Sequence, residues 1–268
     1  MSMSEAVINS NSITRKPGAF EKRIHEIDFA RGVLIALVIM DHLFCWFAQD
    51  GTFNWAWADF YWTCLGREVV RLVVLFLFVF ISGISTAFSR NNWKRAGELL
   101  VFSAIIYVGS AILTLFFQEQ MGFPFRIDFN IIGVLGWSTL FYCFTQGRSW
   151  RILVVGLLIT LLLAWYLIPY LDSYFIAHHM THLNIPELFD PGWGYADWLP
   201  LFPYIFFFFL GAGFSYMFYL PNKESLIKQR GNWERPVCFL GRHSLLFYFG
   251  HQALFIPIFM LIGYLLNK

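Results

Sequence analysis

The feature that most constrains this chain is an ionisable pair inside an apolar run of helical length, IDFARGVLIALVIMDHLF at residues 27–44. A bilayer core about 30 Å thick takes about 20 apolar residues as a helix. Asp41 and His42 come about 14 residues after Asp28, which is about 20 Å along a helix axis. Ionisable side chains at that depth are costly and mark a function by default. The run therefore predicts a membrane helix that carries a function.

The composition indicates that lipid covers much of the surface. Apolar residues make up 58% of the chain and charged residues only 13%, whereas soluble domains average about 25% charged residues. The four cysteines show no C-x-x-C spacing, which favours small buried hydrophobes over a metal or redox framework. They are Cys45, Cys64, Cys143 and Cys238.

The hydrophobic pattern predicts an all-α fold, a polytopic membrane helical bundle of about seven transmembrane helices. The apolar runs are 27–48, 67–89, 95–117, 128–146, 150–170, 198–220 and 238–266. Clusters of charged and turn residues such as SRNNWKR and QGRSWR separate them. Residues 1–22 lack a cleavable hydrophobic region, so we expect a disordered cytoplasmic tail. Residues 23–268 are predicted to form one membrane domain.

The distribution of charge predicts the orientation of the bundle, because basic residues concentrate on the cytoplasmic side of membrane proteins. One set of flanks holds nearly all of them: Arg15, Lys16, Lys22, Arg23, Arg90, Lys94, Arg95, Arg148, Arg151, Lys223, Lys228, Arg230 and Arg235. The opposite flanks hold only Arg67, Arg126 and Lys268. This alternation favours an odd number of spans, with the N-terminus inside and the C-terminus outside.

The first predicted helix carries a polar stripe made of Asp28, Arg31 and His42, with Ile35 on the same face. The eleven residues from Arg31 to His42 are close to three full turns. Asp41 is rotated by about 100° from His42 and is expected to face a neighbouring helix. His42 either packs by a hydrogen bond to another helix or faces a substrate, and its depth favours the second interpretation.

Charged residues near the external ends of two other helices are candidate substrate-binding groups. Arg67 and Arg71 are spaced i, i+4, so they could hold an anion by bidentate contacts or extend to external headgroups. Asp197 precedes the run at 198–220. It either caps that helix or meets Arg67 or Arg71 across the bundle.

The last run has polar residues at its cytoplasmic boundary and near mid-membrane. Arg242 and His243 could bind a cytoplasmic phosphate or form a basic collar that anchors the helix. Ser244 and His251 are seven residues apart and share a face. For His251 a packing role and a functional role both stay open.

Several site types are absent from the sequence. It has no phosphate-binding P-loop, no nucleophile elbow, no HExxH zinc motif and no Rossmann glycine pattern. The external histidines at 178, 179 and 182 have no carboxylate or cysteine at fitting distance, so no metal site is expected. No basic aromatic face is present for nucleic acid.

Five motifs in order resemble the bacterial branch of the heparan-alpha-glucosaminide N-acetyltransferase catalytic-domain family, which belongs with the transmembrane acyltransferases. They are HEIDFARG (25–32), LVIMDH (37–42), LFVFISGIS (77–85), DWLPLFPY (197–204) and GRHSLLFYFGHQ (241–252). The resemblance covers about residues 23–260. The loop at 49–66 has no histidine, whereas the animal lysosomal enzyme of this family carries there the histidine regarded as catalytic.

This resemblance implies a multi-pass enzyme of the bacterial inner membrane. Cytoplasmic acetyl-CoA would be the acyl donor, a sugar amine or hydroxyl at the external face the acceptor, and no metal would be needed. His42 would be the general base, with His251 and Asp41 beside it in the catalytic group. Matched to this task, the CoA-binding residues would be Asp28, Arg31, Arg242, His243 and Ser244, and the substrate-binding residues Arg67, Arg71 and Asp197. A small transporter or flippase without acyl-transfer chemistry is the alternative, and a homodimer is one option for the oligomeric state.

Overall fold

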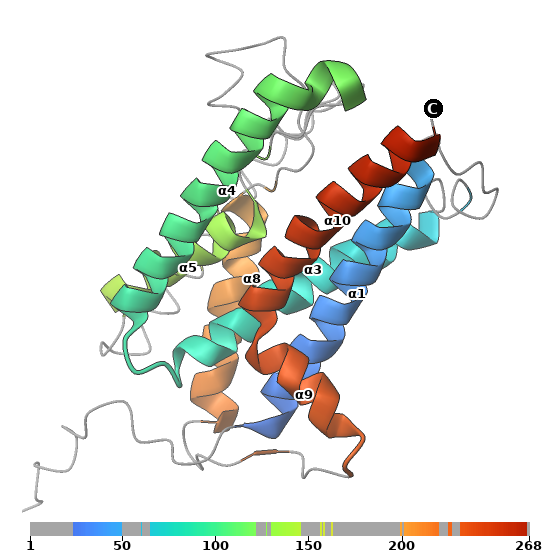
Figure 1. Ribbon diagram of the computed structural model, residues 1–268. Helices are drawn as coiled ribbons and strands as arrows, with labels where there is room; N and C mark the ends of the chain where they lie inside the picture. Colours follow the sequence, from blue (N-terminus) through green and yellow to red (C-terminus); the bar gives the residue numbers. More distant parts are fainter. Residues whose placement is uncertain are drawn as a thin grey trace, which may run out of the picture.

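The computed structural model describes residues 24–49, 60, 65–121, 127, 130–145, 156, 158, 162, 199, 201–219, 225–226 and 231–266 (Figure 1). The elements in these ranges are all helices, which confirms the predicted all-α membrane fold. They are α1 (His25–Gln49), α3 (Leu65–Thr86), α4 (Asn92–Met121), α5 (Ile131–Thr145), α8 (Leu201–Phe214), the π-helical η2 (Ser215–Tyr219), α9 (Glu234–Arg242) and α10 (Ser244–Leu266).

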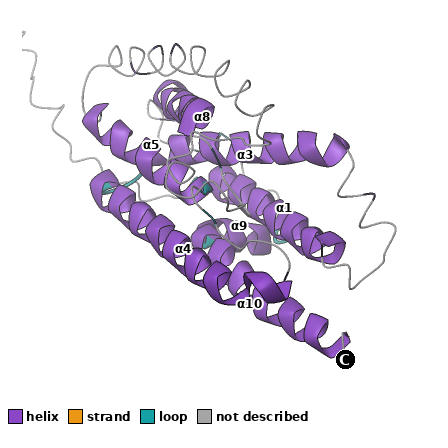
Figure 2. Cartoon of the chain, turned by 90° about the horizontal axis from the view of Figure 1, so that it is seen from above, coloured by secondary structure: helices purple, strands orange, loops and turns teal. Residues whose placement is uncertain are grey.

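The helices α1, α4 and α10 begin at the same end of the bundle, and the short helix α9 lies at that end beside the start of α1 (Figure 1). From above, α3, α5 and α8 group on one side and α4 lies with α10 on the other (Figure 2). Helix α1 packs against α3, α9 and α10. The polar ends of several helices therefore meet where α9 joins α1.

The apolar core lies where α3, α5 and α8 meet. Val79 of α3, Val134 of α5 and Phe208 of α8 are each 0% exposed and belong to one cluster. The sequence of α8, LFPYIFFFFLGAGF, is apolar on every side. Such a helix is stable only when protein or lipid covers its whole surface.

Pairs of glycines allow two helix crossings to be very close. A side chain on Gly32 of α1 would overlap the Val237 carbonyl of α9, and one on Gly241 would overlap the Asp28 carbonyl of α1. In the second crossing, Gly83 of α3 and Gly211 of α8 stand against backbone carbonyls of the partner helix in the same way. Small residues at membrane helix contacts let the two backbones approach and pack.

One face of α4 is apolar and exposed. Its residues follow three- and four-residue spacing and are Val101, Ile105, Val108, Ile112 and Leu115, exposed by 60, 57, 53, 48 and 68%. Val69–Thr86 and Asn92–Phe116 are long and apolar enough to cross a membrane. An exposed apolar stripe of this length suits contact with the hydrocarbon of a bilayer.

Most predicted runs correspond to helices within one to four residues at each end. The run at 150–170 and the tail at 1–22 lie outside the described residues, apart from three positions in that run. The count of seven spans and the N-in, C-out orientation therefore stay predictions.

The prediction of one continuous helix over 238–266 is wrong. The chain turns at His243, where φ is −109° and ψ is 25°, so that α9 ends and α10 begins. The reason is tertiary: α9 lies flat on α1 through Gly32 and Gly241, while α10 runs along the bundle beside α1 (Figure 1). A single straight helix could not make both contacts.

Candidate functional site

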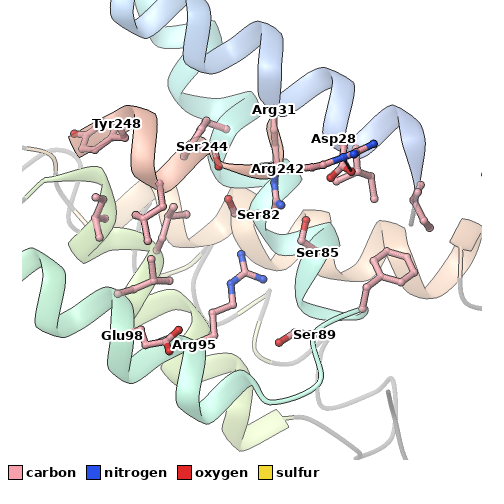
Figure 3. A pocket seen from close by; sticks show the side chains of 18 of the residues that line it. Asp28, Arg31, Ser82, Ser85, Ser89, Arg95, Glu98, Arg242, Ser244 and Tyr248 are labelled. Atoms are coloured by element: carbon pink, nitrogen blue, oxygen red, sulfur yellow. Dashed lines mark hydrogen bonds and ion pairs between the residues drawn. The ribbon is translucent and has the colours of Figure 1, made fainter. Parts of the chain in front are cut away.

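A polar pocket of about 690 Å³ opens at the end of the bundle where α1, α4 and α10 begin. Residues from α1, α3, α4, α5, α9 and α10 line it (Figure 3). Its polar lining consists of Asp28, Arg31, Ser82, Ser85, Ser89, Arg90, Arg95, Glu98, Arg242, Ser244 and Tyr248. This concentration of charge contrasts with the apolar helices around it.

Helical spacing explains how α3 and α10 contribute to this lining. Ser82, Ser85 and Ser89 follow three- and four-residue steps and lie on one side of α3 and of the turn after it. Ser244 and Tyr248 are one turn apart on α10. Small hydroxyl groups leave room in the pocket and can hydrogen-bond to a ligand, Ser85 as an acceptor because it donates its own proton to the Ile81 carbonyl at 2.7 Å.

The turn between α3 and α4 positions two arginines. The buried Asn92 donates its side-chain amide to the Thr86 carbonyl at 3.0 Å, which ties the start of α4 to the end of α3. Asn91 caps α4 by accepting from the Lys94 backbone N–H at 3.0 Å. Arg90 lies within this turn and Arg95 follows in the first turns of α4, so both reach the pocket.

Arg31 and Arg95 extend into the same space beside Ser82 (Figure 3). The two carboxylates of the lining already have cationic partners. Arg242 Nε donates to Asp28 Oδ2 at 3.2 Å, and Lys94 Nζ lies 3.7 Å from Glu98 Oε1. The pocket therefore keeps an excess of positive charge, and guanidinium groups of this kind bind phosphate by bidentate hydrogen bonds.

Hydrogen bonds join α9 to the start of α1 at the end of the bundle where the pocket opens. His25 Nε2 donates to Glu234 Oε2 at 2.7 Å, and the Cys238 thiol lies 3.4 Å from the other ring nitrogen of His25. Glu26 accepts from the Leu226 backbone N–H at 2.6 Å. These contacts clamp the start of α1 to α9 and its preceding segment, which keeps the Arg242–Asp28 pair in place.

Deeper in the bundle, His42 of α1 and His251 of α10 form a pair. His251 Nε2 and His42 Nδ1 are 2.9 Å apart, and the two rings are nearly parallel, with centroids at 4.9 Å and planes at 21°. His251 is only 6% exposed. The ring of Tyr248, which lines the pocket, lies 5.8 Å from that of His251, so the pair stands next to the inner wall of the pocket.

The structure brings together most of the residues proposed for CoA binding and catalysis. Asp28, Arg31, Arg242 and Ser244 line one pocket. His42 and His251, which the family resemblance put in one catalytic group, contact each other.

The other predicted residues lie apart from this arrangement or outside the described side chains. His243 is exposed and its ring packs on Phe239 at 4.7 Å, away from the pocket lining. Asp41 is half-buried on α1, and Arg71 is exposed on α3. The side chain of Arg67 and the whole of Asp197 lie outside the described residues.

From the sequence, Ser85, Ser89, Arg90, Arg95 and Glu98 were not recognised as lining residues. In the sequence the two arginines indicated orientation alone. The available signal was the short spacing of Ser82, Ser85 and Ser89 next to a basic turn. In the described part of the chain, no three metal-ligating side chains cluster.

Comparison with known proteins places this geometry in context. The family model described as heparan-alpha-glucosaminide N-acetyltransferase, catalytic, matches residues 23–253. No curated protein and no solved structure matches the chain. The matched range includes α1 to α9 and the part of α10 that carries His251.

Proposed function

Because the chain belongs to the heparan-alpha-glucosaminide N-acetyltransferase catalytic family, we propose that it is a transmembrane acetyltransferase. Cytoplasmic acetyl-CoA is its donor, and a sugar amine or hydroxyl at the external face of a bacterial inner membrane is its acceptor. The end of the bundle with the arginine pocket then faces the cytoplasm, in agreement with the positive-inside rule.

One observation carries this proposal: the two helices that carry the histidine pair, α1 and α10, both also line the pocket that holds the arginines. Arg31 and His42 are eleven residues apart on α1, which is about 16 Å along the axis. CoA has phosphates at one end of a long pantetheine arm and the thioester at the other. Phosphates held by Arg31 and Arg95 would place the thioester toward His42.

In this mechanism His42 is the general base. It takes the proton from the acceptor amine or hydroxyl as that group attacks the thioester carbonyl, a role suited to a neutral imidazole. The new bond forms at the carbonyl carbon, the C–S bond breaks, and CoA leaves as the thiol or thiolate. Asp41, one residue away on α1, stays a candidate for orienting the acceptor.

The external residues complete the proposal. Arg67, Arg71 and Asp197 are placed by the predicted topology on the side where the acceptor arrives. Arg71 is exposed on α3, so its guanidinium is accessible to an anionic or hydroxyl-rich glycan. A bidentate contact there would orient the acceptor before transfer.

The test uses purified full-length protein in liposomes with labelled acetyl-CoA outside or inside and a panel of amino sugars and glycans. Wild type should release CoA and transfer the label to an acceptor. His42→Ala should lose about 100-fold or more of this rate, as expected for loss of a general base, while CoA binding stays. Equal rates of CoA release by the two proteins would refute the role of His42. A transporter would move solute without consuming acetyl-CoA.

A further inference from the structure

The hydrogen bonds of His251 determine which of its nitrogens carries a proton. His251 Nδ1 lies 2.9 Å from the carbonyl oxygen of Phe247, one turn earlier in α10. A carbonyl oxygen can only accept. Nδ1 of His251 must therefore be the donor, and in the neutral ring Nε2 carries the lone pair.

This assignment extends to His42. His251 Nε2 lies 2.9 Å from His42 Nδ1, so the nitrogen of His42 must donate to it. A neutral His42 then has its proton on Nδ1 and its basic lone pair on Nε2. The hydrogen bonds from Phe247 through His251 to His42 thus permit only the Nδ1–H tautomer of His42 as long as His251 is neutral.

The surroundings of His251 favour this neutral arrangement. His251 is 6% exposed and forms no ion pair with a carboxylate of the described residues, and a buried charge without such a partner is costly. The rings of Tyr248 and Phe255 lie edge-on to it at 5.8 and 5.7 Å, which restricts its rotation. Protonated His251 would donate from both nitrogens and move the proton of His42 onto Nε2, which removes the base.

We infer that His251 is a positioning residue that holds His42 in the Nδ1–H tautomer, so that His42 Nε2 is the nitrogen that takes the acceptor proton. The inference rests on the proposed function for the transfer step. Toward His42, Nε2 of His251 has the role that a carboxylate has in other histidine-based sites, where it orients the imidazole and selects its tautomer.

A spectroscopic test does not depend on acyl transfer. The full chain is labelled with ¹⁵N-histidine in lipid nanodiscs, and the His42 signals are assigned from the spectrum of His42→Gln. Wild type should show His42 protonated on Nδ1 and unprotonated on Nε2. In His251→Asn, whose amide reaches only the position of Nδ1, the Nε2–H form should appear. An Nε2–H form of His42 in wild type would overturn the inference even if the protein is an active acetyltransferase.

A kinetic test uses the conservative variant. In His251→Gln the side-chain oxygen reaches the position of Nε2 and can accept from His42 Nδ1. It should rescue kcat to within about threefold, whereas His251→Asn should lose about 30-fold or more, since a wrong tautomer costs up to about 10⁴-fold in other enzymes. KM for acetyl-CoA should not change in either. Equal losses in the two variants would contradict a positioning role. If the tautomer is found and no acetyl-CoA is consumed, the proposed function alone fails.

Discussion

Arg95 is the residue whose interpretation the structure changes most. In the sequence it is one of many basic residues at a helix flank, but in the structure it shares a pocket with Arg31, Arg90 and Arg242. Arg242 is paired with Asp28, but placing the other three guanidinium groups around one cavity is unfavourable because like charges repel. A bound phosphate or diphosphate would relieve this repulsion, and that is the energetic reason to expect an anionic ligand here.

The corresponding prediction concerns CoA affinity. Arg95→Gln and Arg31→Gln should each weaken CoA binding by about 1–3 kcal/mol, the usual contribution of a charge-assisted hydrogen bond. Titration calorimetry of the purified protein with CoA measures this effect. The matched control is Arg235→Gln, because Arg235 is exposed on α9 and does not line the pocket.

A general charge effect would give a different result. If Arg235→Gln lowered the affinity as much as Arg95→Gln, the loss would reflect net charge at this end of the bundle. If Arg31→Gln and Arg95→Gln bound CoA with wild-type affinity, CoA would not bind in this pocket.

Among the elements, the crossing of α3 and α8 is the most sensitive to a small change. Its two glycines bring the helix backbones so close that an added methyl group would meet a backbone carbonyl, which cannot move aside as a side chain can. Ser82 and Ser85, which line the pocket, lie on either side of Gly83 in the sequence of α3. The crossing therefore helps to fix their position. Packing of this crossing therefore affects the pocket as well as stability.

We expect Gly83→Ala to lower the stability of the protein. Overpacking a tight contact costs about 1–3 kcal/mol, which exceeds the gain of about 0.5–1 kcal/mol that alanine normally brings to a helix over glycine. Thermal unfolding in detergent, followed by circular dichroism, measures the difference in Tm. Gly109→Ala in α4 is the control, because a Cβ at Gly109 meets nothing within 4 Å.

The Tm of Gly83→Ala should be lower than that of wild type, whereas the Tm of Gly109→Ala should not fall. Gly109→Ala should be as stable as wild type or slightly more stable. An unchanged Tm for Gly83→Ala would mean that the two backbones can separate at little cost, and the crossing would then not control the position of α3.

For the molecule as a whole, the mechanism depends on which end faces the cytoplasm. The charge alternation predicts an internal N-terminus and an external C-terminus. In a bacterial expression host, alkaline phosphatase fused after Lys268 should be active and a fluorescent protein fused there should be dark. As the control, the same reporters fused before the first residue should give the fluorescent protein signal. The reverse pattern would place the arginine pocket on the external side, where acetyl-CoA is absent.

The sequence alone determined the helical membrane fold, because apolar runs of bilayer length leave the backbone no other way to satisfy its hydrogen bonds. It also placed Asp28 and Arg31 on one helix face, since the period of a helix is known from local geometry. The family resemblance added the expected chemistry, and the match over residues 23–253 confirms that family.

Only the tertiary structure decided how the helices meet. Helical periodicity relates residues on one helix but gives no distance between two helices, so it could not pair His42 with His251 or bring Arg95 to Arg31. It also missed the turn at His243, because the end of α9 depends on close contact with Gly32 of α1. Those relations come from the packing of backbones and side chains from distant parts of the chain, which no local pattern encodes.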